Sequence, residues 1–231
     1  MIVWLASYPR SGNTMFRMAL KHLYGIDTYS FYADQDIVSM GAAQIVGHMR
    51  ERIDVQELAK SDQVYFVKTH ESIPVPASRN FKAIHIVRDG RDTLTSYAHY
   101  RVKVNGLKFV NKLATPSQSM DDLLTTSAHI WGGWSGHAGV WMDWQGQSVR
   151  VRYEDMVLDI CNVIDGALET IGEPQLPLSD GNMPDFGHLK SKWPQFFRKG
   201  QVGSWNGFMT KKQLEIFWAR HGSMMQELGY V

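Results

Sequence analysis

Residues 4–20 read WLASYPRSGNTMFRMAL, a stretch that joins an apolar run to an amphipathic one. The apolar run over residues 2–7 is typical of a buried strand, and residues 14–24 have the spacing of an amphipathic helix. Between them, a proline, an arginine, a glycine and two hydroxyl residues interrupt the pattern. A strand that turns through glycine into a helix directs several backbone N–H groups to one point, beside the positive end of the helix dipole. The junction is therefore either an ordinary tight turn or a cradle for an anion.

Further strands and helices alternate along the chain. Strands are predicted over 63–68, 82–87 and 147–152. Helices are predicted from a cap at Ser119 to about Trp144, over 155–171 and over 210–228, and residues 172–208 have the proline and glycine content of an irregular segment. This alternation predicts an α/β fold with a mainly parallel sheet covered by helices on both faces.

Length and composition exclude several classes of protein. With 231 residues, 44% of them hydrophobic, the chain is predicted to form a single globular domain over residues 1–231. A net charge of +1 argues against an extended nucleic-acid surface, and the single cysteine, Cys161, cannot form an intramolecular disulfide. No apolar stretch is long enough to span a bilayer, and the short N-terminal run MIVWLA fits a strand better than a signal peptide, so a cytoplasmic location without membrane attachment is expected.

The junction at residues 8–14 carries the side chains that an anion site needs. Arg10 supplies a full positive charge, while Ser11, Asn13 and Thr14 supply short hydrogen-bond donors. The motif GxxxxGK[ST] of P-loop NTPases is absent. The alternative interpretation is a simple turn in which Gly12 satisfies the backbone geometry.

The strand predicted over 63–68 ends in the tripeptide KTH. Lys68 and His70 would lie at the carboxyl end of a parallel strand, the edge at which open α/β sheets bind ligands. Being two residues apart, they can act on the same side. A single histidine is more often structural, but a neighbouring lysine at this edge favours chemistry.

Two further groups of residues have the character of anion ligands. Arg88 follows the strand over 82–87, and Ser96 lies about two turns into the next helix. Near the C-terminus, Arg198 and Lys199 precede Gly200 in a segment with loop composition. Pairing of the arginines with nearby aspartates, or a solvated turn, is the alternative for each group.

Taken together, these motifs carry a family resemblance. The segments YPRSGNT, KTH, the spacing from Arg88 to Ser96, YEDM at 153–156 and RKGQVGSW at 198–205 resemble, in order and spacing, the cytosolic-type sulfotransferases, in the form of a compact, bacterial-like member. These enzymes use 3′-phosphoadenosine 5′-phosphosulfate (PAPS) as sulfuryl donor. The resemblance implies a P-loop-like fold similar to that of nucleotide kinases, adenosine 3′,5′-bisphosphate (PAP) as product, a small-molecule acceptor with a hydroxyl or amine, and no metal.

The resemblance also implies roles for individual residues. His70 would be the general base, and Lys68 and Arg10 would lie beside the transferred group. The 5′-phosphosulfate would be held by Arg10, Ser11, Gly12, Asn13 and Thr14. The 3′-phosphate would be held by Arg88, Ser96, Arg198, Lys199 and Gly200. Tyr153 would lie near the adenine.

Two departures from the family pattern affect the nucleotide site. Arg10 stands where the family has a lysine, which keeps the charge but changes its reach and geometry. Met15 stands where the family often has a tryptophan that stacks on adenine, so Phe197 or Phe196 is expected to contribute more. An ATP-dependent small-molecule kinase and a non-catalytic PAP-binding protein are the two other classes that remain open.

The remaining histidines and most aromatic residues are expected to be structural. Aromatic residues at helical spacing are more often core than ligand contacts. This interpretation covers His85, His99, His129 and His137 and the tryptophans Trp131, Trp134, Trp141 and Trp144. The basic segment over 101–118 is read as a solvated face, with a lid over the site as the alternative.

Overall fold

The computed structural model groups the chain into two compact units. The described residues are 1–32, 34–49, 54–72, 81–105, 115–126, 132–174, 176–194 and 196–231. The first unit comprises Met1–Val87 and Val140–Pro184, and the second comprises Arg88–Gly139 and Asp185–Val231. Each unit is described by itself.

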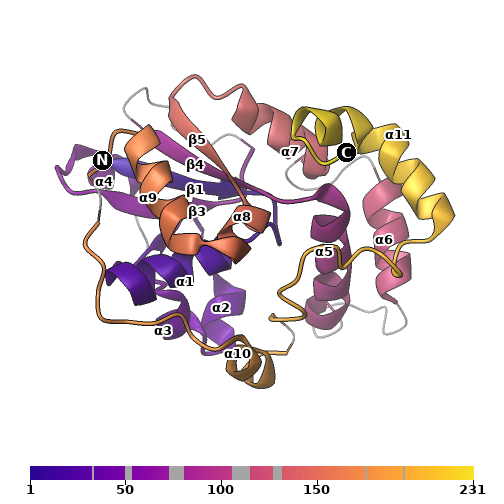
Figure 1. Ribbon diagram of the computed structural model, residues 1–231, viewed down its shortest axis with the longest axis horizontal. Coiled ribbons are helices and arrows are strands. Elements are labelled where there is room, and N and C mark those ends of the chain that lie inside the picture. The colour runs from indigo at the N-terminus through magenta and orange to yellow at the C-terminus, as the bar shows by residue number, and fades with distance from the viewer. Residues whose placement is uncertain are drawn as a thin grey trace. The chain divides into compact units, whose positions relative to one another are not determined.

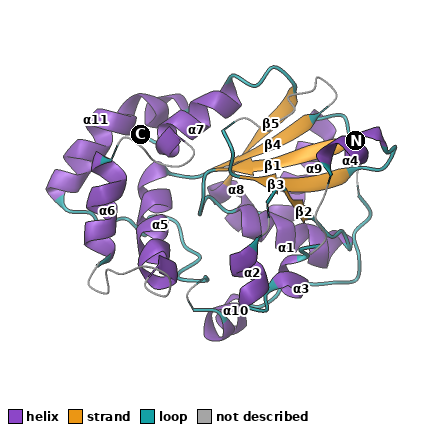
Figure 2. Ribbon diagram, turned by 180° about the vertical axis from the view of Figure 1, so that it is seen from behind, coloured by secondary structure: helices purple, strands orange, loops and turns teal. Residues whose placement is uncertain are grey.

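The first unit is built on a parallel sheet (Figures 1 and 2). The strand order is β2-β3-β1-β4-β5, and every strand pair is parallel. The strands are β1 (Ile2–Ser7), β2 (Tyr29–Ser30), β3 (Tyr65–Thr69), β4 (Lys82–Val87) and β5 (Gln147–Arg152). The predicted α/β class is confirmed, and the predicted strands are present to within two residues at each end.

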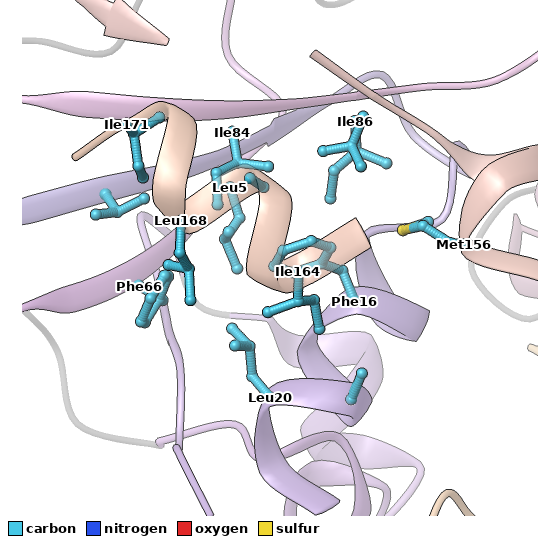
Figure 3. Packing of buried hydrophobic residues seen from close by; sticks show 14 of the residues in the cluster. Leu5, Phe16, Leu20, Phe66, Ile84, Ile86, Met156, Ile164, Leu168 and Ile171 are labelled. Carbon is cyan, nitrogen blue, oxygen red and sulfur yellow. The ribbon is translucent and has the colours of Figure 1, made fainter. Parts of the chain in front are cut away.

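Both faces of the central strand β1 are buried, as its continuous apolar run predicts. On one face, Val3 and Leu5 pack with Ile84 of β4 against Phe16 and Leu168 of the covering helices, as Figure 3 shows for Leu5, Ile84, Phe16 and Leu168. The opposite face forms a second cluster, which contains Ile2, Trp4, Ala6, Val55 and Trp141. The sheet is therefore covered on both sides within the first unit.

Among the described residues, six helices lie wholly within the first unit. They are α1 (Asn13–Tyr24), α2 (Gln35–Ser39), α3 (Ala43–Val46), α4 (Val55–Lys60), α8 (Tyr153–Leu158) and α9 (Ile160–Thr170). The single helix predicted over 155–171 is wrong, because Asp159 is extended and ends α8. Its side chain accepts the N–H of Asn162 and so caps α9. The short elements β2, α2, α3 and α4 were not predicted.

The second unit is helical. Its helices are α5 (Gly90–Asn105), α6 (Pro116–Thr125), α10 (Phe186–Lys192) and α11 (Lys211–Glu227), and α7 (Gly133–Met142) runs from the second unit into the first. Helices α5, α6 and α11 lie side by side in both ribbon views. Helix α10 lies in the segment predicted to be irregular, while α11 confirms the predicted final helix.

The predicted continuous helix from Ser119 to Trp144 is wrong. Thr115 forms a capping box with Gln118, and Pro116 occupies the first turn, so α6 begins before Ser119, which is buried inside it. The structure resolves two helices, α6 and α7, in place of one. Gly132 and Gly133 have φ of 73° and 75°, which L side chains rarely adopt, and α7 begins there.

The register brings the carboxyl ends of neighbouring strands to one edge of the sheet. Leu5 of β1 lies opposite Lys68 of β3, and Ser7 lies opposite Ile86 of β4. The loop that follows β1 and the KTH tripeptide therefore leave the sheet at the same edge. None of the described helices has the length and apolar character to cross a bilayer.

Candidate active site

The loop after β1 has a strained backbone. Arg10 has a φ of 71°, and it is the one non-glycine residue with positive φ in the described part of the chain. Gly12 has a φ of 113°, and a Cβ there would lie 2.6 Å from Cδ2 of Tyr153 and 2.9 Å from Cε of Met156. Strain of this kind persists only where the surroundings enforce it, and it concentrates at binding sites. The loop is therefore held in one shape by the residues beneath it.

Helix α1 begins immediately after this loop. Its N-cap is Gly12, which has no side chain for capping, and its first turn carries no acidic residue. The first-turn N–H groups lack intrahelical partners and direct the positive end of the helix dipole outward. Thr14 lies within the helix and does not cap it. The backbone thus has the arrangement of the predicted anion cradle.

Two of the predicted donors in the loop face inward. Ser11 is 1% exposed and Asn13 is 4% exposed. The amide Nδ2 of Asn13 donates to the carbonyl oxygen of Leu5 at 2.8 Å and to Oγ of Ser7 at 3.2 Å. Asn13 therefore ties the loop to the end of β1.

His70 is fixed by the end of the same strand. Its Nδ1 lies 2.7 Å from the carbonyl oxygen of Ser7 and 3.3 Å from the Ser7 hydroxyl. A carbonyl oxygen can only accept a hydrogen bond, so Nδ1 carries the proton. In the neutral ring, Nε2 is consequently the basic nitrogen.

Lys68 is buried and forms an ion pair with Asp34. Its Nζ lies 5.3 Å from the centre of the Tyr32 ring, and that ring lies 6.1 Å from the ring of His70. Lys68 and His70 therefore border the same aromatic side chain. Asp34 also pairs with Arg17 of α1 at 2.8 Å.

Asp34 and Arg17 were not predicted from the sequence as site residues. The available signal was Arg17 itself, an arginine between the apolar residues Phe16 and Met18. A buried guanidinium requires an acidic partner. Which acid supplies it depends on tertiary contacts, because Asp34 is 17 residues away in sequence.

Tyr153 and Met15 belong to the hydrophobic core around the loop. Tyr153 is 6% exposed, and its ring packs on Gly12. Met15 packs against the same core cluster. In the free protein, both side chains support the loop from the core, and the predicted adenine contact of Tyr153 stays a prediction.

In the second unit, Asp92 organises a separate group of residues at the start of α5. Its carboxylate is fully buried and accepts hydrogen bonds from Gly203 N at 2.7 Å, Trp205 N at 2.8 Å and Ser204 Oγ at 3.0 Å. Nη2 of Arg88 lies 3.4 Å from the same carboxylate and donates to the Gln201 carbonyl at 2.9 Å. This carboxylate therefore fixes the segment over 201–205 next to Arg88.

Arg198 joins this group through Ser204. Its Nη2 donates to Ser204 Oγ at 2.9 Å, and its buried Nε has no hydrogen-bond partner among the described residues. Burial lowers the pKa of the Arg198 guanidinium, and the positive charge of Arg88 lowers it further. Two guanidiniums that repel each other, one with an unused buried donor, form a group to which an anion can bind.

The other predicted ligands of the second unit lie near these residues in sequence. Ser96 is buried at 8% exposure in α5, while Lys199 is exposed. Gly200 has a φ of 62°, and a Cβ there would lie 2.7 Å from the Phe186 ring. The Phe186 ring is in edge contact with Phe197 at 6.3 Å.

Several alternatives raised by the sequence are decided by the structure. Arg91 pairs with Asp89 at 2.6 Å and stacks over the Trp205 ring at 4.4 Å, so it has a structural role. His85 and His137 are buried, and their structural interpretation stays a prediction. His129, Trp131 and residues 106–114 of the basic segment lie outside the described residues.

Comparison with known proteins decides the family. The model of the sulfotransferase domain family matches residues 2–229. The chain belongs to the sulfotransferase domain family. The resemblance inferred from its motifs is therefore confirmed, and the prediction of a sulfotransferase holds for nearly the whole chain.

Curated sulfotransferases are similar to this chain along most of its length. Flavonol 3-sulfotransferase of Flaveria bidentis is 22% identical over 245 residues, which cover 92% of this chain and 78% of that protein. Sulfotransferase 1B1 of Canis lupus familiaris is 24% identical over 241 residues, covering 92% of this chain and 79% of that protein.

Solved structures share the fold of this sulfotransferase. Mouse sulfotransferase SULT7A1, complexed with PAP, has a TM-score of 0.67 and 21% identity, covering 97% of this chain and 84% of its own. Retinol dehydratase, in complex with androsterone and PAP, has a TM-score of 0.61 and 19% identity, with 93% and 77% coverage. These similarities establish the sulfotransferase fold.

Proposed function

We propose that this sulfotransferase moves the sulfuryl group of PAPS to a hydroxyl or amine of a small-molecule acceptor, with His70 as general base. The observation that carries the proposal lies in the first unit. A glycine loop opens a helix at the same sheet edge at which Lys68 and His70 leave the neighbouring strand. This is the combination of anion cradle, cation and base that sulfuryl transfer requires.

The loop after β1 is suited to the 5′-phosphosulfate. The N-terminal N–H groups of α1, the charge of Arg10 and the hydroxyl of Thr14 supply donors to an anion. Gly12 allows the backbone to approach the ligand closely, and Ser11 and Asn13 stabilise the loop from beneath. Bound there, PAPS supplies the sulfuryl group.

The second unit is suited to the 3′-phosphate. The unused buried donor Nε of Arg198 supports an anionic ligand, and the nearby guanidinium of Arg88 would share its charge. Ser96, Lys199 and the backbone at Gly200 would complete this group. Phe197 is proposed as the aromatic contact for adenine.

The tautomer of His70 supports its role as base. Because Nδ1 donates to the Ser7 carbonyl, Nε2 has the lone pair that would take the proton of the acceptor. Lys68 and Arg10 would stabilise negative charge on the leaving phosphate, so positioning and electrostatics supply most of the catalysis.

The names of the relatives guide the choice of acceptors to test. One curated relative is a flavonol sulfotransferase, and androsterone is bound to one structural relative. Hydroxyl-bearing polycyclic molecules are therefore the first acceptors to screen. Location in the cytoplasm stays part of the proposal.

Calorimetric titration with PAP tests the nucleotide assignment. Tight binding of PAP, with much weaker binding of AMP and of ATP with magnesium, is expected, since the 3′-phosphate would meet Arg88 and Arg198. Tighter binding of ATP with magnesium would indicate the alternative, a small-molecule kinase.

Turnover of the variant His70→Ala tests the base. We expect a loss of kcat of about 10²-fold or more, with PAP affinity unchanged, because general-base catalysis contributes about 10²–10⁴-fold. Turnover equal to that of the wild type would reject His70 as the base, and a chain that binds PAP without any turnover would be a nucleotide sensor.

A further inference from the structure

The first unit buries a carboxylate between two cations. Asp34 is 7% exposed, and its oxygens divide between Arg17, which is 1% exposed, and Lys68, which is 9% exposed. Oδ2 accepts from Nη1 of Arg17 at 2.8 Å, and Oδ1 accepts from Nζ of Lys68. Buried charges require this kind of pairing, because each unpaired charge would be strongly destabilising.

Asp34 does not cap the helix that follows it, although aspartates at the N-cap position usually do. It is the N-cap of α2, yet its side chain caps no backbone N–H. The N-cap aspartates Asp54, Asp159 and Asp185 all accept backbone N–H groups of the helices they precede. The carboxylate of Asp34 is instead committed to the two cations.

Arg17 holds the carboxylate in place from the other side. Its Nε donates to Thr28 Oγ1 at 2.7 Å, and its Nη2 lies 3.0 Å from Nδ1 of His48. Thr28 Oγ1 in turn donates to the Gly47 carbonyl at 3.1 Å. Arg17 is therefore anchored by α1 and by two segments outside it, so Asp34 has a fixed position from which to act on Lys68.

We propose that Asp34 is a positioning residue that keeps the Lys68 ammonium charged and directed along the face of Tyr32 at the end of β3. The use of that charge in sulfuryl transfer rests on the proposed function. The coupling between Asp34 and Lys68 does not, because it is a property of the free protein.

The electrostatic surroundings of Lys68 leave it dependent on Asp34. Burial lowers the pKa of the Lys68 ammonium, and the charge of Arg17 on α1 lowers it too, while Asp34 raises it and Asp36 on α2 adds a smaller effect in the same direction. Tyr32 faces the ammonium, and its pKa is raised by burial, so it stays neutral. Without the carboxylate, burial and Arg17 would both favour the neutral amine.

The test measures the protonation of Lys68 directly. Protein labelled with ¹³C-lysine is titrated by NMR, and the Lys68 signal is assigned by its loss in Lys68→Arg. In Asp34→Asn, we expect the proton affinity of Lys68 to fall at least about tenfold, since an opposite charge at contact shifts a pKa by about 1–3 units. An unchanged midpoint in a folded Asp34→Asn variant would overturn the proposal.

Two further variants test the same coupling: one should change the proton affinity of Lys68 in the opposite direction, and the other is a control. Arg17→Gln removes the competing cation and leaves Asp34 to Lys68, so the proton affinity of Lys68 is expected to rise. Asp36→Asn removes a nearby carboxylate that has only a small effect, so a much smaller fall is expected. If Asp34→Asn does not fold, the rise in Arg17→Gln decides, and a fall there would overturn the proposal.

Turnover shows whether the reaction uses this charge. In Asp34→Asn, the alkaline limb of kcat against pH should move to lower pH, and in the double variant Asp34→Asn, Lys68→Arg it should not, since a guanidinium stays charged. An unmoved limb in Asp34→Asn would reject the catalytic part of the proposal. A chain without PAP binding would reject the proposed function and leave the NMR result standing.

Discussion

In the loop after β1, the backbone conformation and the neighbouring side chains restrict residue 12 to glycine. Its φ of 113° strains any L side chain, and a Cβ added there would lie only 2.6 Å from Cδ2 of the Tyr153 ring. Arg10, two residues earlier, carries left-handed strain without being glycine. Strain in this loop is consistent with a backbone shaped for a ligand rather than for its own stability.

The variant Gly12→Ala tests this geometry. We expect it to lower the free energy of unfolding by about 2–5 kcal/mol, from left-handed strain of about 1–2 kcal/mol and overpacking of about 1–3 kcal/mol. PAP affinity should fall as well. Gly25→Ala is the matched control, because Gly25 has a φ of 68° and nothing within 4 Å of its added Cβ.

The two glycine variants are compared by chemical denaturation and by PAP titration. Gly25→Ala should lose only about 1–2 kcal/mol and keep its PAP affinity. Equal losses of stability and equal PAP affinities in the two variants would contradict the assigned role of the loop.

The pKa of His99 leads to a prediction of how the free energy of unfolding depends on pH. Burial lowers the pKa of His99, and the charges of Arg198, Lys103 and Lys199 lower it further, against the effect of the Thr95 carbonyl. In the unfolded chain, where the histidine pKa is about 6.5, His99 therefore takes up a proton at higher pH than it does in the folded protein. The stability that neutral His99 contributes is complete above that value and is lost as the pH falls toward the folded pKa.

Thermal unfolding between pH 7.5 and pH 5.5, chosen as about one unit to either side of the ordinary histidine pKa, measures this effect. The melting temperature of the wild type should fall more across this range than that of His99→Gln. A variant with the same or a steeper fall would show that His99 does not titrate in this way.

At the scale of elements, the segment over 198–205 depends on a carboxylate of another element. Asp92, in the first turn of α5, accepts three hydrogen bonds from Gly203, Ser204 and Trp205. Asp92 therefore holds the segment that follows Arg198.

The variant Asp92→Asn should loosen this segment. An amide can accept at only one of its two positions, so the variant is expected to lose about 2–3 kcal/mol of stability and several-fold in PAP affinity. Asp159→Asn is the control, because the Asp159 carboxylate caps α9 and an amide oxygen can still accept the N–H of Asn162. Equal PAP affinities in the two variants would argue against Asp92 as the organiser of this segment.

Element boundaries show where local sequence signals are sufficient. The capping boxes at Thr115 and Thr210 define the starts of α6 and α11, and the second start was predicted correctly. The start of α6 was not predicted, because Ser119 also has the character of a cap, although Pro116 already marks the first turn. The break at Asp159 was missed since a polar residue on an exposed helix face gives no periodic signal.

At the scale of the whole molecule, we expect the two units to unfold together, because the chain passes back and forth between them. Each unit consists of two separate segments, so neither is a continuous piece of chain that could fold before the rest is synthesised. We therefore propose that residues 1–231 unfold as a single domain. One calorimetric transition is expected, whereas two resolved transitions would show two independent domains.

Ligand binding gives a second test at this scale. PAP at about 100 times its dissociation constant should stabilise the protein by about 2.7 kcal/mol and raise the melting temperature by about 5–11 °C. AMP at the same concentration should have much less effect. A shift that is the same for both nucleotides would remove the support for a 3′-phosphate site.

The parallel α/β sheet, the position of the loop after β1 and the sulfotransferase family were predictable from the sequence, because they depend on local periodicity and on short motifs that follow one another in a defined order along the chain. The contacts of the polar groups became evident only in the folded structure. Asp34 pairs with Lys68 across 34 residues, and Asp92 binds Ser204 across 112. Such pairs stabilise charges that folding removes from water, and the sequence offers many acidic residues that could do this. Which of them forms the pair depends on the fold, because the fold brings the two residues together.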